Sequence, residues 1–363
     1  MSRARQKEKK AKRRKERLRQ LKHLQHLQHY ASDSPVESEE YWAEDDGEDA
    51  EMEEVEADPI EMPSRLKMER SLRALHRVIE KQRFSSADEA NRFLEKLGPD
   101  GLKNLERQLQ EDPKERAQEL AYQAQEARSI FEAASLAKRA LELDPLNVDA
   151  LVSKAVTTAR NDEEQLTLIQ EAVRAGEQAL GGPAFFDENK GRFWRIIDTR
   201  PYMRTRMDLA VMLLEMQRTG EAITHLNALL DLNPNDNQGV RDTLLGALLS
   251  QGDREGAKRL LDRYKGDGSA IFRWGETLER FLAGDFAGAE RALEKARKHN
   301  PHVEDLLLGR RKPPREKPDY YSFGDEREAA RVYFESVGQA WRGNRDALSW
   351  LKELNRPKWA KEK

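Results

Sequence analysis

The chain has 363 residues, of which 36% are charged and 37% hydrophobic, and it contains no cysteine. The lack of cysteine excludes disulfides, thiol nucleophiles and thiolate metal sites, and it favours a reducing, cytoplasmic setting. No stretch approaches the roughly 18 consecutive apolar residues of a transmembrane helix, so no membrane span is expected. The Lys/Arg-rich start is not followed by an apolar region, so no secretory signal is predicted.

The formal net charge of -3 conceals two opposite charge blocks at the start of the chain. The first 20 residues hold eleven Lys/Arg and two Glu, whereas residues 32 to 58 hold fourteen Asp/Glu and no basic residue. We therefore expect a disordered charged arm over 1–61, basic over 1–30 and an acidic linker over 31–61. Two interpretations of the basic part stay open: a contact for nucleic acid or another polyanion, and a solvated tail neutralised by the linker.

A small helical preface is predicted over 62–112. Apolar residues recur there with the period of a helix, at Leu66, Met68, Leu72, Leu75, Val78 and Ile79. Gly98 and Pro99 are expected to break the second helix of this segment, with a third helix after them. We see no chemistry in the preface.

Helix–turn–helix repeats are predicted over 113–308. Three alanines lie 35 and 32 residues apart, and each is followed four residues later by a leucine: Ala222, Ala257 and Ala289. The phrases that end at Pro234 and Pro301 lie 67 residues apart, or two periods of about 34, which is typical of tetratricopeptide repeats. The predicted fold is therefore an all-α, tetratricopeptide-like helix-turn-helix solenoid.

The repeats are not evenly spaced along this region. Two are expected at about 114–147 and 148–180, followed by an insertion near 181–200, and three more start near Met203, Gln238 and Ala270. A loop with three prolines follows over 309–324. A capping helix pair, split at Gly343 and Asn344, is predicted over 325–355, with a tail over 356–363.

Polar and aromatic residues gather where the first helices of two repeats are expected to start. They are the candidate partner-binding residues Arg200, Tyr202, Arg204, Arg206, Asn237, Gln238 and Arg241. Helix N-termini and arginine forks suit a carboxylate or phosphate, so an anionic peptide in the concave groove is one interpretation. The other is that Arg200 or Arg241 links the insertion to the repeat core.

A loop motif adds three aromatic candidates, Tyr320, Tyr321 and Phe323. They either anchor a partner or fold back to cover the open edge of the last repeat. The clamp of chaperone-tail-binding repeat domains is not expected here. The corresponding places hold Met207, Val211, Thr243, Gly246, Trp274 and Leu278.

Several short segments in this part of the chain are more specific to one protein family than the repeat period is. They are GRFW (191–194), TRPYMR (199–204), LNPNDNQGVR (232–241), NPHV (300–303), YYSFG (320–324), AW (340–341) and ALSWL (347–351). With them the chain resembles the soluble, non-animal relatives of the suppression-of-tumorigenicity-seven family, over about two thirds of its length. The resemblance implies a tetratricopeptide-type fold and brings no reaction or catalytic residue. Animal members carry membrane spans, and none is expected here.

No enzyme motif is present: there is no phosphate loop, no HExxH, no GxSxG and no glycine-rich dinucleotide turn. The spacing of His23, His26 and His29 does not bring all three imidazoles to one helix face, so no metal site is expected. No cofactor is predicted. We expect a non-enzymatic interaction scaffold that binds a protein or peptide. The alternatives are a nucleic-acid- or ribosome-associated factor that uses the basic arm, and an enzyme with an unfamiliar site in the insertion.

Overall fold

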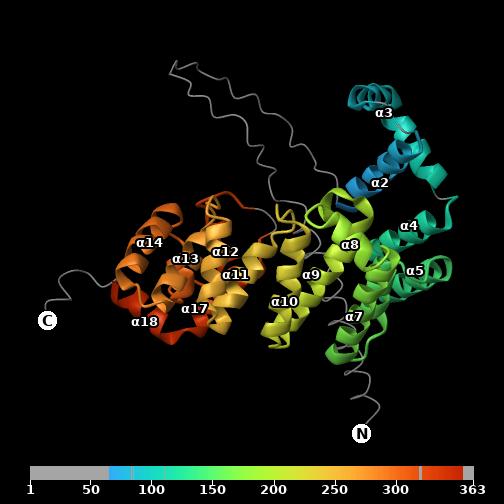
Figure 1. The fold of residues 1–363 in the computed structure, drawn as a ribbon. Coiled ribbons are helices and arrows are strands. Elements are labelled where there is room, and N and C mark those ends of the chain that lie inside the picture. Colours follow the sequence, from blue (N-terminus) through green and yellow to red (C-terminus); the bar gives the residue numbers. More distant parts are fainter. Residues whose placement is uncertain (1–64, 83, 85, 110, 319–320, 355–363) are drawn as a thin grey trace, which may run out of the picture. The chain divides into compact units, whose positions relative to one another are not determined.

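The computed structural model describes residues 65–82, 84, 86–109, 111–318 and 321–354 (Figure 1). Its regular elements in these ranges are helices, packed pairwise in sequential order, so the predicted all-α class is confirmed. The predicted arm, its three histidines and the predicted tail lie outside the described residues. No helix within these ranges has both the length and the apolar character needed to cross a membrane. The chain divides into two compact units, unit 1 (residues 1–158) and unit 2 (residues 159–363).

Unit 1 is built around alanines at the crossings of its helices. The helices are α2 Arg65–Gln82, α3 Ala87–Leu109, α4 Pro113–Glu126, α5 Ile130–Leu143 and α6 Val148–Thr158. Ala117, Ala121, Ala140 and Ala150 have no exposed surface, and they let α4, α5 and α6 approach closely. Asp112 caps α4 by accepting hydrogen bonds from two of its first amides, and the next residue is a proline that suits the first helical position.

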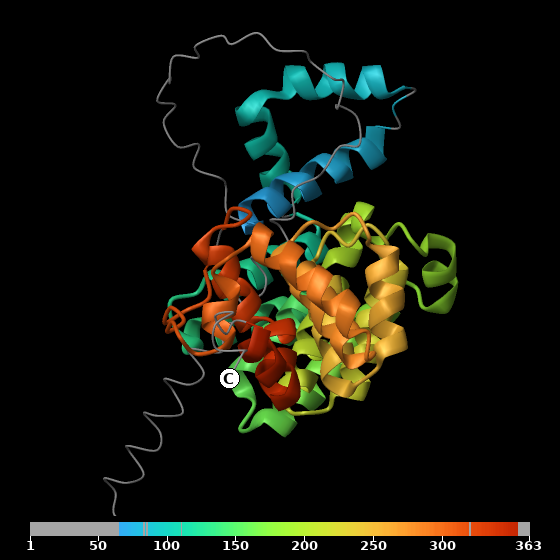
Figure 2. The same cartoon turned by 90° about the vertical axis from the view of Figure 1, so that its left-hand side faces the viewer.

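The predicted break in the preface is absent. α3 continues through Gly98 and Pro99 as one helix, and it bends along its length (Figure 2). A proline inside a helix removes one backbone hydrogen bond and bends the axis without ending the helix. The sequence rule is correct about the distortion, whereas the extra helix boundary that we predicted there is wrong.

Unit 2 contains helix pairs over the ranges in which three repeats were predicted. Its helices are α7 Asp162–Ala179, α8 Pro183–Asn189, η1 Phe193–Arg195, η2 Ile197–Thr199, α9 Arg200–Glu215, α10 Thr219–Leu232, α11 Val240–Gln251, α12 Arg254–Arg263, α13 Ala270–Leu282, α14 Phe286–His299, α15 Val303–Leu307, α16 Glu326–Phe334, α17 Ser336–Gly343 and α18 Arg345–Leu354. The pairs α9/α10, α11/α12 and α13/α14 lie where helix pairs were expected, and α8, η1 and η2 form the insertion. The boundary between the compact units falls within the predicted repeat 148–180.

The second helices of two pairs start with the same turn, spelled GDREGA and GDFAGA. Gly252 and Gly284 take left-handed backbone angles, with φ of 75° and 78°. In each turn the following aspartate, Asp253 or Asp285, accepts a hydrogen bond of 2.9 Å from the glycine amide three residues on. Gln217 fills the equivalent left-handed place before α10, with φ of 60°. The turns before α12 and α14 therefore share their capping hydrogen bonds as well as the spacing of their apolar residues.

The C-terminal segment forms three helices where the sequence predicts a pair. The predicted split at Gly343 and Asn344 is present, but extended backbone at Glu335 also separates α16 from α17. α17 packs mainly against α11, and α16, α17 and α18 all contact α13 (Figures 1 and 2). These helices therefore lie against α11 and α13, the first helices of the last two pairs.

Candidate partner-binding faces

The start of α9 holds four of the predicted residues. Arg200 donates from Nε to the carbonyl oxygen of Trp194 at 3.3 Å, and its Cζ lies 4.9 Å from the centroid of the Trp194 ring. This contact joins α9 to η1, which agrees with the interpretation that Arg200 links the insertion to the repeat core. Arg204 is only 3% exposed, so most of its side chain is turned away from solvent.

Tyr202 and Arg206 meet one turn apart on α9. The Tyr202 hydroxyl donates to Glu177 Oε1 at 3.3 Å and accepts a hydrogen bond from Arg206 Nη1. The Tyr202 ring is 1% exposed and packs edge-on against Phe186, with 5.2 Å between ring centroids. Burial raises the pKa of the Tyr202 hydroxyl to about 12, so the phenol stays neutral. The structure thus brings together the buried Tyr202 and the half-buried Arg206.

The turn before α11 is organised by Asp236, which was not in the predicted set. It is 1% exposed, and its carboxylate accepts hydrogen bonds from the amides of Val240 at 2.7 Å and Arg241 at 2.9 Å. Arg241 donates from Nε to Asp267 at 2.7 Å, and its Cζ lies 5.3 Å from the centroid of the Tyr264 ring. Arg241 therefore links α11 to the α12–α13 connection, a structural role like the one considered for it but with a different partner.

Asn237 and Gln238 lie in the same turn. Asn237 is half-buried. Gln238 is 3% exposed, and neither its amide oxygen nor its amide nitrogen has a hydrogen-bond partner. Buried amides without partners are uncommon in proteins. In this conformation Gln238 is too enclosed to touch a partner.

The aromatic loop divides between packing and exposure. Tyr320 lies outside the described residues. The ring of Tyr321 lies under Arg331 of α16, with Cζ 4.6 Å from its centroid, and burial followed by the nearby Asp242 raises the pKa of the Tyr321 hydroxyl. Phe323 touches His299, at 5.9 Å between rings, yet remains 63% exposed. Tyr321 thus packs against α16, whereas the ring of Phe323 is largely open to solvent.

Gly246 and Trp274, two of the positions that correspond to the chaperone-tail clamp, are covered by α17. A Cβ added at Gly246 of α11 would lie 2.2 Å from the backbone carbon of Ser336 and 2.3 Å from the amide nitrogen of Val337. Trp274 of α13 packs against Trp341, and both side chains have no exposed surface. This side of α11 and α13 is consequently an interior contact.

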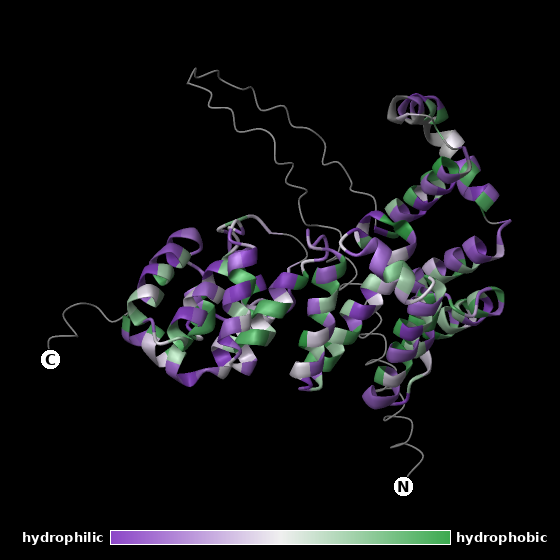
Figure 3. Cartoon of the chain, in the orientation of Figure 1, coloured by the Kyte–Doolittle hydropathy of each residue, from purple (hydrophilic) through white to green (hydrophobic). Residues whose placement is uncertain are grey.

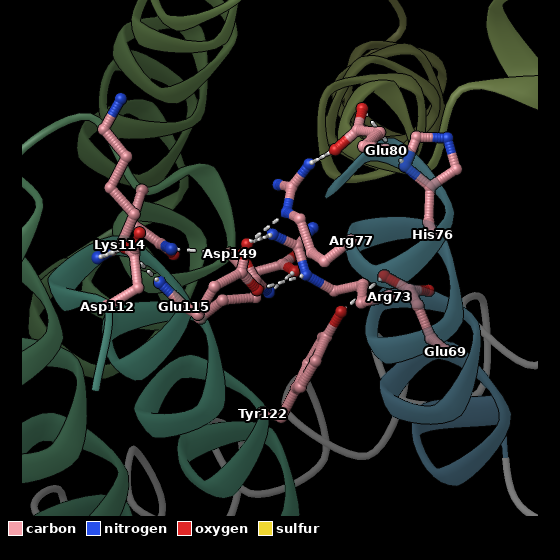
Figure 4. Close-up of polar contacts among 12 residues, drawn as sticks. Glu69, Arg73, His76, Arg77, Glu80, Asp112, Lys114, Glu115, Tyr122 and Asp149 are labelled. Atoms are coloured by element: carbon pink, nitrogen blue, oxygen red, sulfur yellow. Dashed lines mark hydrogen bonds and ion pairs between the residues drawn. The ribbon is translucent and has the colours of Figure 1, made fainter. Parts of the chain in front are cut away.

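Unit 1 presents a different arrangement, in which α4 holds an arginine-bearing helix, α2 (Figure 4). Glu115 accepts hydrogen bonds from Nε and Nη2 of Arg73 at 3.1 and 3.0 Å, a two-point contact with a guanidinium. It also accepts from Nε of Arg77 at 2.8 Å. Glu115 and Arg73 are each 9% exposed, so this pair is largely shielded from water.

One turn further along the same contact, Arg70 joins two more glutamates of α4. Its Nε lies 2.8 Å from Glu119 Oε2, and its Nη2 lies 2.9 Å from Glu126 Oε2. Burial disfavours the charge of Arg70, but its hydrogen bonds to Glu126 and Glu119 outweigh burial and raise its pKa. Glu115, Glu119 and Glu126 follow the spacing of one helix face. We call this set of three the acidic face of α4.

Polar contacts continue beside the acidic face. Tyr122 donates to Glu69 of α2 at 2.8 Å, and Gln118 donates to Asp149 of α6 at 2.7 Å. A pocket of about 200 Å³ opens between the helices, lined by Arg70, Arg73, Glu106, Leu109, Glu115, Gln118, Glu119 and Tyr122.

The sequence analysis did not predict this site because it followed only the apolar stripe of the preface. The available signal was the spacing of arginines 70, 73 and 77 on α2 and of the three glutamates on α4.

The carboxylates of the acidic face accept hydrogen bonds from guanidinium groups of α2. No group of three or more residues suited to metal binding occurs among the described side chains.

Comparison with known proteins leaves the family of this chain unassigned. No protein-family model matches it, and a search of curated proteins finds no match. The all-α fold of sequentially packed helices therefore rests on the structure itself.

Proposed function

We propose that this protein is a non-enzymatic adaptor built as a tetratricopeptide-like solenoid, which binds a segment of a partner protein on the acidic face of α4. The observation that carries the proposal is the contact described for Glu115, Glu119 and Glu126. These residues already hold a helix through directed hydrogen bonds to arginines. A helix laid on a neighbouring helical surface is a general mode of peptide recognition.

The repeat character of the proposal is supported by two features of unit 2. Helix pairs follow the predicted period, and two pairs share the glycine–aspartate turn. Such arrays bind partners on the side lined by the first helix of each pair. In unit 2, α17 covers that side of α11 by a close backbone contact at Gly246, whereas in unit 1 α2 lies on α4 through ion pairs, and this difference favours the α4 side as the place for a partner.

Affinity capture with variants of the full chain tests the proposal. Glu115→Gln/Glu119→Gln neutralises the acidic face, and Glu132→Gln/Glu142→Gln makes the same charge change on exposed positions of α5. We expect a partner that the unmodified chain and the α5 variant retain and that the α4 variant loses. The double variant Arg200→Ala/Arg204→Ala, made in parallel, reports on the residues predicted in α9. Retention by the α4 variant and loss by the α9 variant would move the site to unit 2.

A second candidate function is association with nucleic acid or the ribosome through residues 1–30. The observation behind it is the excess of eleven Lys/Arg over two Glu in the first 20 residues. Binding of this kind weakens steeply with salt, because it releases counterions from phosphates. Capture of RNA that disappears in high salt, with both glutamate variants behaving alike, would favour this function over the adaptor.

A further inference from the structure

The contact between α2 and α4 is made largely by charged and polar groups. Besides the three arginines on the acidic face, Arg65 donates to Gln125 at 2.9 Å, and Glu69 accepts from Tyr122. Ala74 and Val78 are buried, whereas the larger apolar residues Met68, Leu72 and Ile79 are 39%, 37% and 40% exposed. α2 therefore turns its arginines toward the repeat helices and part of its apolar stripe toward solvent. Both kinds of residue alternate along it in Figure 3.

The docking of α17 in unit 2 is the opposite case. Val337 and Trp341 have no exposed surface, and the backbone of α17 lies directly on Gly246. A helix held by a close-packed apolar contact separates only with loss of the core. α2 is held mainly by ion pairs, and water and salt compete for those at the exposed rim of the contact, such as the pair of Arg70 with the 45% exposed Glu126.

From this contrast we infer that α2 is a built-in competitor for the acidic face of α4, and that the partner is a basic amphipathic helix that displaces it. The inference rests on the proposed function and specifies its ligand. The partner helix carries arginines at i, i+3 and i+7, as Arg70, Arg73 and Arg77 do in α2. Arginine fits better than lysine, because Arg73 contacts Glu115 through two nitrogens and Arg70 bridges two carboxylates.

α2 then sets the affinity for the partner. While α2 covers the face, only molecules with α2 detached can bind the partner. The apparent dissociation constant is therefore the intrinsic constant divided by the detached fraction. Weakening α2 in the intact chain should therefore strengthen binding of a basic helix. A purely structural α2 would have no such effect.

The probe is a fluorescent synthetic peptide with the sequence of residues 65–82, titrated into three full-length proteins. The first is unmodified. The second carries Arg70→Gln, Arg73→Gln and Arg77→Gln, which release α2 and leave the acidic face intact. The third adds Glu115→Gln, Glu119→Gln and Glu126→Gln to the second. The control peptide has lysine in place of the same three arginines and keeps the charge.

We expect the second protein to bind the peptide about tenfold more tightly than the first, the third to bind it no better than the first, and the lysine peptide to bind more weakly. Equal affinity of the first and second proteins overturns the competitor role. Undiminished binding by the third overturns the acidic face as the site, and equal binding of the two peptides overturns the arginine preference. If the peptide experiment fails while capture still depends on Glu115 and Glu119, the adaptor function stands and its ligand is of another kind.

Amide hydrogen exchange on the unmodified full chain gives a second test that needs no variant. Raising salt from about 0.1 M to about 1 M shortens the Debye length from about 10 Å to about 3 Å. We expect exchange of α2 to become faster over this change while exchange of α17 stays the same. Identical protection of α2 at both salt concentrations would show that salt does not weaken the contact of α2 with α4, which contradicts its displacement by a partner helix.

Discussion

Trp341 of α17 donates its indole Nε1–H to the backbone carbonyl oxygen of Trp274 in α13, at 3.0 Å. The two rings meet edge to face with 5.8 Å between centroids, and neither side chain is exposed. The pair thus combines the satisfied indole N–H of Trp341 with the contact of two large buried rings, while Nε1 of Trp274 has no hydrogen-bond partner. It joins residues 67 positions apart and fixes the C-terminal helices to the repeat helices.

Replacing Trp341 by alanine should lower the free energy of unfolding of unit 2 by about 3–5 kcal/mol, because it leaves a large cavity in a closed contact. Chemical denaturation followed by circular dichroism measures the change. Phe323→Ala is the matched control, since it removes an aromatic ring that is 63% exposed, and it should change stability little. Similar effects of the two variants would contradict the interior role of α17.

Gly246 tests the same contact from the side of α11. A methyl group there would meet the backbone of Ser336 and Val337, which cannot move aside as the end of a flexible side chain can. We expect Gly246→Ala to destabilise unit 2 by about 1–3 kcal/mol, despite the better helix propensity of alanine.

The control for this prediction is Gly220→Ala in α10. A Cβ at Gly220 would approach only Nε2 of Gln251, at 3.3 Å, which is the mobile end of a side chain. This substitution should be neutral or slightly stabilising in the same denaturation assay. A stabilising Gly246→Ala would show that α17 does not rest on α11 in solution.

The helix pairs could be predicted because their causes are local. The alanine spacing, the closing prolines and the glycine–aspartate turns each occur within a single helix pair, and side-chain capping marks where α12, α13 and α14 begin. Pro99 shows the limit of such rules, because a proline can end a helix but here lies within α3, which continues past it.

The contacts that decide the candidate sites are long-range, and sequence pattern does not specify them. Tyr202 lies at a helix start as expected, but contacts with the insertion and α7 make it interior. The glycine at position 246 indicates only that another part of the chain packs closely against α11, and the sequence does not show that this part is α17. Likewise, the arginines of α2 and the glutamates of α4 each form a regular row, and only the folded chain pairs them.

Glu328 is the polar counterpart of Trp341 in holding the C-terminal helices. It is 2% exposed, and its two oxygens accept from the Ala270 amide at 2.8 Å, the Gly324 amide at 2.6 Å and Asn300 Nδ2 at 3.0 Å. Glu328→Gln replaces one acceptor by a donor and leaves buried amides unpaired. We expect a loss of about 2–3 kcal/mol in the free energy of unfolding. Glu326→Gln, two residues earlier and exposed, should have little effect, and equal effects would refute the role of Glu328.

Asp236 predicts how the stability of unit 2 depends on pH. Burial raises the pKa of Asp236 to about 6, although hydrogen bonds from Arg241 and Val240 and the charge of Arg241 act in the opposite direction. Because this folded-state pKa lies above the unfolded value of about 3.9, the folded chain binds the proton more readily between these two values. Stability should therefore rise as pH falls from about 7 to about 5, and the contribution of this one group is about 1 kcal/mol.

Asp236→Asn removes the titrating group while keeping an oxygen for the start of α11, so it should flatten the stability profile between pH about 5 and about 7. Asp231→Asn, on an exposed position of α10, is the control and should leave the profile unchanged. Denaturant titrations at several pH values measure both slopes. A profile that keeps its slope in Asp236→Asn would assign the pH dependence to another carboxylate of the same cluster. Asp242 is the first alternative, because burial and the neighbouring Asp267 raise its pKa as well.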